Sequence, residues 1–76
     1  MLQAFILIAV SSGSERFIYD QLKQLPEVEE INEIFGEYDL IIRISVKDTR
    51  ELDTLVSDKI RAIKDIKLTS TMIVAR

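Results

Sequence analysis

The chain has 76 residues, a net charge of −3, and neither cysteine nor histidine. Without these side chains it has no disulfide, no imidazole base and no zinc site of the usual kind, so most enzyme classes are excluded. We therefore expect no enzyme, no metal site and no cofactor. Lys and Arg are interleaved with a larger number of Asp and Glu, which argues against direct binding of nucleic acid. The length predicts one domain over residues 1–76, small enough to be marginally stable without a partner surface.

The sequence shows no segment suited to a membrane. Its longest apolar run, Ala4–Val10, is far shorter than the roughly 20 residues that span a bilayer. Its first residues lack the basic region and cleavage site of a signal peptide. We expect a soluble, cytoplasmic protein with no membrane contact.

The first half of the chain reads as strand, helix, strand. Gln3–Val10 is a run of apolar and β-branched residues, and turn residues follow it. Ser12 and Glu15 have the spacing of a capping box, which predicts a helix start there. The helix ends before Pro26, and its apolar stripe consists of Phe17, Ile18, Leu22 and Leu25. Val28–Phe35 mixes acidic and apolar residues, a pattern typical of an edge strand.

The second half repeats this order after a turn at residues 36–39. Leu40–Val46 is nearly all apolar and predicts a central strand. Asp48 and Glu51 open a second helix, and Ile66–Ala75 forms the last strand. The apolar stripe of this helix consists of Leu52, Leu55, Val56, Ile60 and Ile63.

The two halves match each other at a constant offset of half the chain length. Apolar residues align in pairs: Ile6 with Ile44, Ile8 with Val46, Phe17 with Leu55, Ile18 with Val56, Leu22 with Ile60, Leu25 with Ile63, Val28 with Ile66, and Ile34 with Met72. A strand-helix-strand unit written twice predicts an α+β, ferredoxin-like βαββαβ plait. Its four-stranded antiparallel sheet would carry both helices on one face, with the first and third strands central.

The other face of the first strand is also apolar. Phe5, Leu7 and Ala9 point away from the helices, yet two helices can cover only one face. Leaving this surface in water would forgo several kcal/mol at about 25 cal/mol per Å². We therefore predict a homodimer that forms through the open sheet face and includes Ile41 and Arg43 of the third strand.

Several motifs resemble the effector-binding domain of the Lrp/AsnC family, the RAM module. They are Pro26-Glu27-Val28, the hairpin Gly36-Glu37-Tyr38-Asp39 with Leu40-Ile41 after it, Ile63-Lys64-Asp65-Ile66, and Thr69-Ser70-Thr71. The resemblance covers essentially the whole chain. It implies dimers that assemble into higher oligomers, an amino acid bound where dimers meet, and a role in transcriptional regulation. Because no helix-turn-helix arm precedes the first strand, it implies the stand-alone form of the module, able to join a full-length DNA-binding relative.

The candidate ligand site consists of Gly36, Tyr38, Asp39, Thr69, Ser70 and Thr71. A free amino acid needs an anion for its ammonium group and donors for its carboxylate. Asp39 can serve the ammonium group and the three hydroxyl residues can serve the carboxylate, while Gly36 permits close approach and Tyr38 can wall the pocket.

Plainer interpretations of these residues remain open. Gly36 suits a turn, Asp39 can bond turn amides, and residues 69–71 suit cross-strand packing. The glutamates of the second strand are typical of a solvated edge rather than a cation site.

Two other functions share the predicted fold. One is a ferredoxin-like enzyme, such as an acylphosphatase-like hydrolase or a dimeric α+β barrel oxygenase, for which Arg43 alone among central-strand residues is a candidate. The other is an ACT-like regulatory module, whose ligand contacts would lie in the first strand-helix loop.

Overall fold

The computed structural model describes residues 1–76, whose four strands form one antiparallel sheet in the order β2-β3-β1-β4. The elements in chain order are β1 (Leu2–Val10), α1 (Glu15–Lys23), β2 (Val28–Glu33), β3 (Leu40–Val46), α2 (Thr49–Thr54), η1 (Leu55–Ile60) and β4 (Ile66–Ile73). This confirms the predicted ferredoxin-like plait, with β1 and β3 central and β2 and β4 at the edges.

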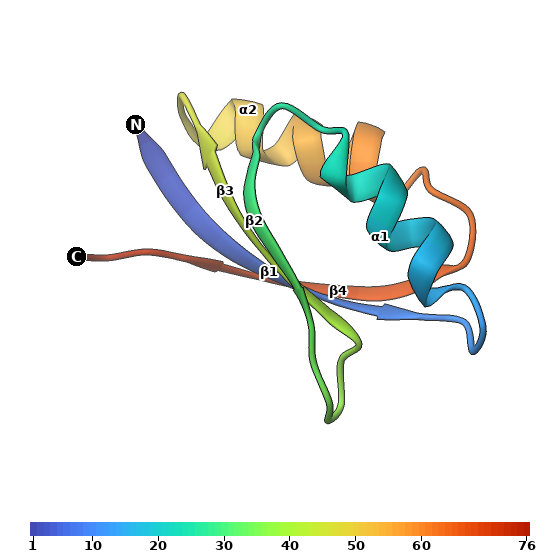
Figure 1. The fold of residues 1–76 in the computed structure, drawn as a ribbon. Coiled ribbons are helices and arrows are strands. Elements are labelled where there is room, and N and C mark those ends of the chain that lie inside the picture. Colours follow the sequence, from blue (N-terminus) through green and yellow to red (C-terminus); the bar gives the residue numbers. More distant parts are fainter.

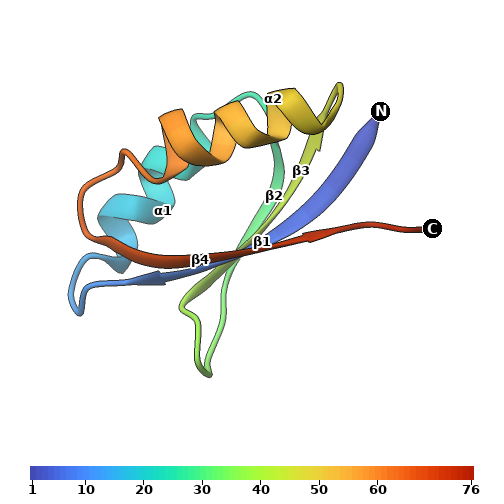
Figure 2. The ribbon, with the colours of Figure 1, turned by 180° about the vertical axis from the view of Figure 1, so that it is seen from behind.

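The molecule has two layers. Both helical segments lie on one face of the twisted sheet, and no element covers the other face (Figure 1). The view from behind shows the same arrangement, with β4 passing beneath the helical layer (Figure 2). The helices therefore leave one side of β1 and β3 open.

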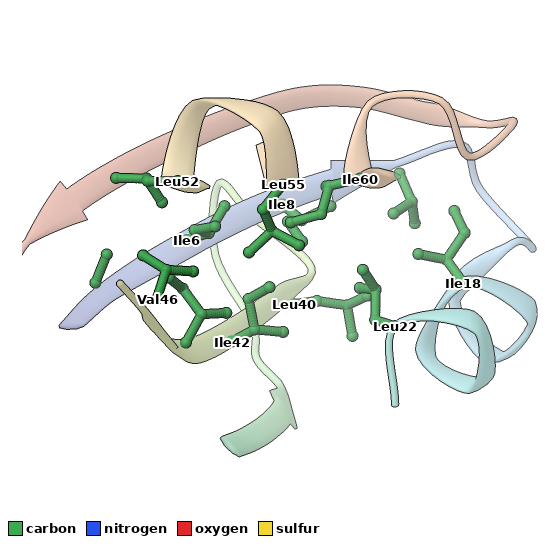
Figure 3. Packing of buried hydrophobic residues seen from close by; sticks show 13 residues of the cluster. Ile6, Ile8, Ile18, Leu22, Leu40, Ile42, Val46, Leu52, Leu55 and Ile60 are labelled. Atoms are coloured by element: carbon green, nitrogen blue, oxygen red, sulfur yellow. The ribbon is translucent and has the colours of Figure 1, made fainter. Parts of the chain in front are cut away.

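The core lies between the sheet and the helices. It contains 13 buried residues, all of them hydrophobic (Figure 3). Alternate residues of the central strands supply most of it: Ala4, Ile6, Ile8 and Val10 from β1, and Leu40, Ile42, Ile44 and Val46 from β3. Complete burial of each large aliphatic side chain contributes about 1.5–3 kcal/mol, so these two strands dominate the packing energy.

Helix α1 begins later than the capping-box spacing predicts. Gly13 has φ +92°, and this turn moves the N-cap to Ser14 rather than Ser12. Glu15 still reaches back, because its Oε1 accepts a hydrogen bond from the Gly13 N–H at 2.9 Å. Ile18 and Leu22 are buried, but Phe17 is 55% exposed. Since residues i and i+4 share a helix face and i+1 does not, Phe17 falls beside the apolar stripe rather than on it.

The second helix changes its winding halfway. Asp48 is its N-cap and accepts a hydrogen bond from the Glu51 N–H at 2.9 Å, as its sequence position predicts. From Leu55 to Ile60 the chain forms a π-helical turn, η1, rather than the regular α-helix that we expected. Leu55 and Ile60 are both buried although they are five residues apart. In an α-helix they would differ by about 140°, and the wider turn brings both onto the core.

Candidate functional site

The open face of the sheet carries a mixed apolar and charged surface. Strand register defines its rows: Glu30, Arg43, Phe5 and Met72 form one, and Asn32, Ile41, Leu7 and Ser70 form the next. Ala9 lies opposite Leu68 beyond them. All five residues predicted at the dimer interface, namely Phe5, Leu7, Ala9, Ile41 and Arg43, lie on this face and are half-buried in the isolated chain.

The β2–β3 hairpin projects beyond the body of the sheet, on the side away from the helices (Figure 1). Phe35 near its tip is fully exposed. Gly36 has φ +138°, and a Cβ added there would meet no atom within 4 Å. The backbone angle rather than crowding therefore requires glycine at this position within the single chain.

Asp39 is held against the end of β1 by two hydrogen bonds and within its own hairpin by a third. The Val10 N–H donates to its Oδ2 at 2.8 Å, and the Asp39 N–H donates to the Ile8 carbonyl at 2.9 Å. Its own carbonyl accepts from the Ile34 N–H at 2.9 Å. Asp39 thus bonds to β1 as well as within its turn, and its Oδ1 accepts no hydrogen bond within the chain. Tyr38, its neighbour, is half-buried.

The hydroxyl triplet of β4 is divided between the two faces. Thr69 pairs with Ile8 and Thr71 with Ile6, so both lie on the helix side, whereas Ser70 pairs with Leu7 on the open face. This alternation follows from the period of two along a strand. One strand therefore does not present the three hydroxyl groups together, in contrast to the grouping that we predicted for one carboxylate.

The hairpin and the triplet flank the same strand. Leu40 and Thr69 both pair with Ile8, from opposite sides of β1. Two interstrand spacings of about 4.8 Å separate them, or roughly 10 Å. Asp39 and Thr69 thus lie on either side of the last residues of β1, and the six candidate residues do not line a common pocket in one chain.

Two shallow hollows adjoin the β4 hydroxyl groups. Thr71 lines a groove of about 230 Å³ between β4 and α2, together with Thr49, Leu52, Asp53, Val56 and Ile73. Thr69 lines a hollow of about 250 Å³ with Arg61, Ile66, Lys67 and Leu68. Arg61 and Lys67 are cations beside a candidate carboxylate-binding residue, and we did not identify them from the sequence. The signal was weak because charges on helix ends and edge strands are usually solvated.

Two glutamates at or just before the start of β2, Glu27 and Glu29, each make an ion pair within the chain. Lys59 Nζ on η1 donates to Glu27 Oε2 at 2.8 Å, and Arg43 Nε lies 3.6 Å from Glu29 Oε1. The hydrogen bond from Lys59 lowers the pKa of Glu27 below its ordinary value. Burial has the opposite and smaller effect on this pKa. No three potential metal ligands cluster anywhere in the structure.

Neither helical segment has the length and apolar character required to cross a bilayer.

A four-stranded antiparallel sheet with two helical segments on one face places the chain in the class of small ferredoxin-like α+β domains. Residues 3–76 match the family model described as the Lrp/AsnC ligand binding domain. The chain therefore belongs to the Lrp/AsnC family. This confirms the resemblance drawn from the hairpin and the last strand.

The curated relatives that the chain matches first are transcriptional regulators. The HTH-type transcriptional regulator FL11 of Pyrococcus furiosus is 36% identical over 73 residues, which are 96% of this chain and 48% of the relative. The chain thus spans about half the length of the curated relatives that it matches first. A homocitrate synthase of Sulfurisphaera tokodaii is 36% identical over 56 residues, 74% of this chain but 12% of that enzyme. The matched family model is a ligand-binding domain, and the first relatives that share nearly the whole chain are transcriptional regulators.

Solved structures share the fold over the whole chain. The crystal structure of FFRP-DM1 is 40% identical, with a TM-score of 0.94, and the match covers 97% of this chain and 99% of that one. AsnC of E. coli is 28% identical with a TM-score of 0.94, over 99% of this chain and 51% of AsnC. A transcriptional regulator of Neisseria meningitidis, solved as a complex with L-Met, is 21% identical with a TM-score of 0.90 over 99% of this chain and 50% of that one, a likeness of fold alone.

Proposed function

We propose that residues 1–76 act as one amino-acid-sensing module, which forms a homodimer through its open face and assembles further. The effector binds between subunits, and the resulting change in assembly modulates transcription in the cytoplasm. The observation that carries this proposal is the apolar open face of β1 and β3, where Phe5, Leu7 and Ile41 lie together in register.

The size of the open face suits a dimer. Four strands spaced by about 4.8 Å and a central strand rising about 3.3 Å per residue give a flat area of roughly 500–600 Å². Side chains that project from the sheet increase the accessible area of the face above this flat value. Each partner in a standard interface buries about 800 Å². Met72 is 48% exposed and Leu68 is 57% exposed, so β4 extends the apolar area to the sheet edge.

The effector site in this proposal is made of two subunits. Gly36, Tyr38 and Asp39 contribute the hairpin, and Thr69, Ser70 and Thr71 contribute β4. Oδ1 of Asp39 accepts no hydrogen bond within the chain, so it is available to an ammonium group. Because these residues do not enclose a pocket within one chain, ligand binding and assembly form one linked equilibrium.

The nature of the effector follows from the chemistry of these groups and from the relatives. Carboxylate and hydroxyl groups suit the two polar ends of a free amino acid. The complex of the Neisseria regulator with L-Met supports an amino acid as the ligand class. The full-length HTH-type relatives support a route to DNA through assembly with such a protein. The small matched share of homocitrate synthase supports a binding rather than a catalytic role.

A thermal-shift panel of the standard amino acids tests the proposal. A ligand at 100 times its Kd adds about 2.7 kcal/mol to stability, which gives a clear rise in Tm. We expect at least one positive amino acid and a change in oligomer size by light scattering when it is added. Asp39→Ala should abolish the shift, and Glu37→Ala on the same hairpin should preserve it. A flat panel combined with unchanged oligomer size would contradict the sensor function.

A further inference from the structure

Arg43 is the one cation within the apolar part of the open face. It lies at the middle of β3, in register with Phe5 on β1 and with Glu30 on β2. Ile41 precedes it by two residues on the same face. A guanidinium in this position has to be matched by an anion once the face is covered.

Arg43 is poorly matched within its own chain. Its Nε lies 3.6 Å from Glu29 Oε1, which is too long for a hydrogen bond. That Nε is buried and has no hydrogen-bond partner, although the side chain as a whole is 42% exposed. A small cavity of about 90 Å³ lies beside it, lined by Phe5, Glu30, Asn32, Ile41, Ile42 and Arg43. The space and the unused donors both lie on the open face.

Glu30 is the complementary group. It is exposed, lies across from Arg43 in register, and makes no ion pair within the chain. The surface thus carries one insufficiently paired cation and one unpaired anion next to each other. A two-fold interface presents the same surface from both copies, so such a charge pair can be satisfied reciprocally and twice.

We propose that Arg43 of each copy pairs with Glu30 of the other across the open face, and that this reciprocal ion pair selects the partner. The inference rests on the proposed open-face dimer and deepens it. The apolar residues supply most of the attraction, while the ion pair rejects any surface without a carboxylate opposite Arg43. The face therefore fits a second copy of this chain.

A charge-exchange experiment tests the pair by sedimentation velocity. Arg43→Glu leaves a glutamate at both position 30 and position 43 of each copy, and Glu30→Arg leaves an arginine at both positions. Each variant alone should dimerise at least about tenfold more weakly than the wild type, because both contacts become repulsive. An equimolar mixture should recover the wild-type affinity, because both contacts of the heterodimer are then complementary. Glu33→Arg, on the same strand but in register with Leu40 on the other face, should dimerise normally.

The outcomes distinguish a failure of the ion pair from a failure of the open-face dimer. Wild-type dimerisation with unaffected Arg43→Glu and Glu30→Arg variants would overturn the ion pair and leave the open-face dimer standing. Weakened variants without recovery in the mixture would also overturn it, since the two residues would then act separately. A monomeric wild type would refute the proposed assembly and the pair together. A double-mutant cycle provides a second test. The losses of dimerisation free energy in Arg43→Gln and Glu30→Gln should not add up in the double variant.

Discussion

The carboxylate of Asp39 accepts a hydrogen bond from the Val10 N–H at 2.8 Å, which fixes the start of β3 to the end of β1. The same residue is our candidate for the ammonium group of an effector. One oxygen therefore has a structural role, while the other accepts no hydrogen bond within the chain. A substitution of Asp39 should therefore affect both the stability of the hairpin and the binding of an effector at the proposed site.

Asp39→Ala should destabilise the chain by about 1–3 kcal/mol, because the Val10 N–H loses a charged acceptor. Asp39→Asn retains a side-chain oxygen and should cost less. Both are measured by urea unfolding. Glu37→Ala on the exposed tip should change the free energy of unfolding by less than about 0.5 kcal/mol. Equal stability of Asp39→Ala and wild type would contradict the structural role of this bond.

Two residues of α1, Leu22 and Phe17, test where the core lies. Leu22 is fully buried, so Leu22→Ala should cost about 2–5 kcal/mol through lost burial and the cavity left behind. Phe17 is 55% exposed, and Phe17→Ala should cost much less even though it removes more atoms. Denaturant titration of the two variants gives both values. A larger loss for Phe17→Ala than for Leu22→Ala would contradict the packing of α1.

The ion pair between Glu27 and Lys59 predicts a pH dependence of stability. Because the pKa of Glu27 is lowered in the folded chain, its contribution is fully present above the ordinary value of 4.5 and is lost as pH falls through the lowered value. The main cause is the hydrogen bond from Lys59, followed by the smaller opposing effect of burial.

Lys59→Met should therefore reduce stability by about 1 kcal/mol near neutral pH, and by progressively less as the pH falls below 4.5. Thermal unfolding at a series of pH values measures the difference. Lys64→Met, which removes an exposed lysine with no ion pair, provides the control. A loss that is the same at acidic and neutral pH would show that Lys59 acts through packing instead.

Much of the fold could be predicted because its periodicities are simple. Leu40–Val46 has the predicted bounds as β3, and Asp48 caps the second helix as its spacing indicates. The late start of α1 could not be predicted, since it depends on how Gly13 turns the chain onto the sheet. The π-helical turn also depends on tertiary packing, because it brings Leu55 and Ile60 onto one core.

The candidate site was less predictable than the fold. The sequence identifies the hairpin and the β4 hydroxyl groups, but the period of two divides Thr69 and Thr71 from Ser70. The bond from Val10 to Asp39 joins residues 29 positions apart and has no local signature. The proposed two-subunit pocket depends on the relative placement of two copies, which one chain's sequence does not encode locally.

Sedimentation velocity of the wild-type chain beside Leu7→Asp tests the central claim most directly. Leu7 lies at the centre of the open face, between Ile41 and Ser70 in register. We expect the wild type to sediment at micromolar concentration as a dimer or larger species, and Leu7→Asp to sediment as a folded single chain. A folded wild-type monomer at that concentration, or a Leu7→Asp variant that stays dimeric, would contradict the account.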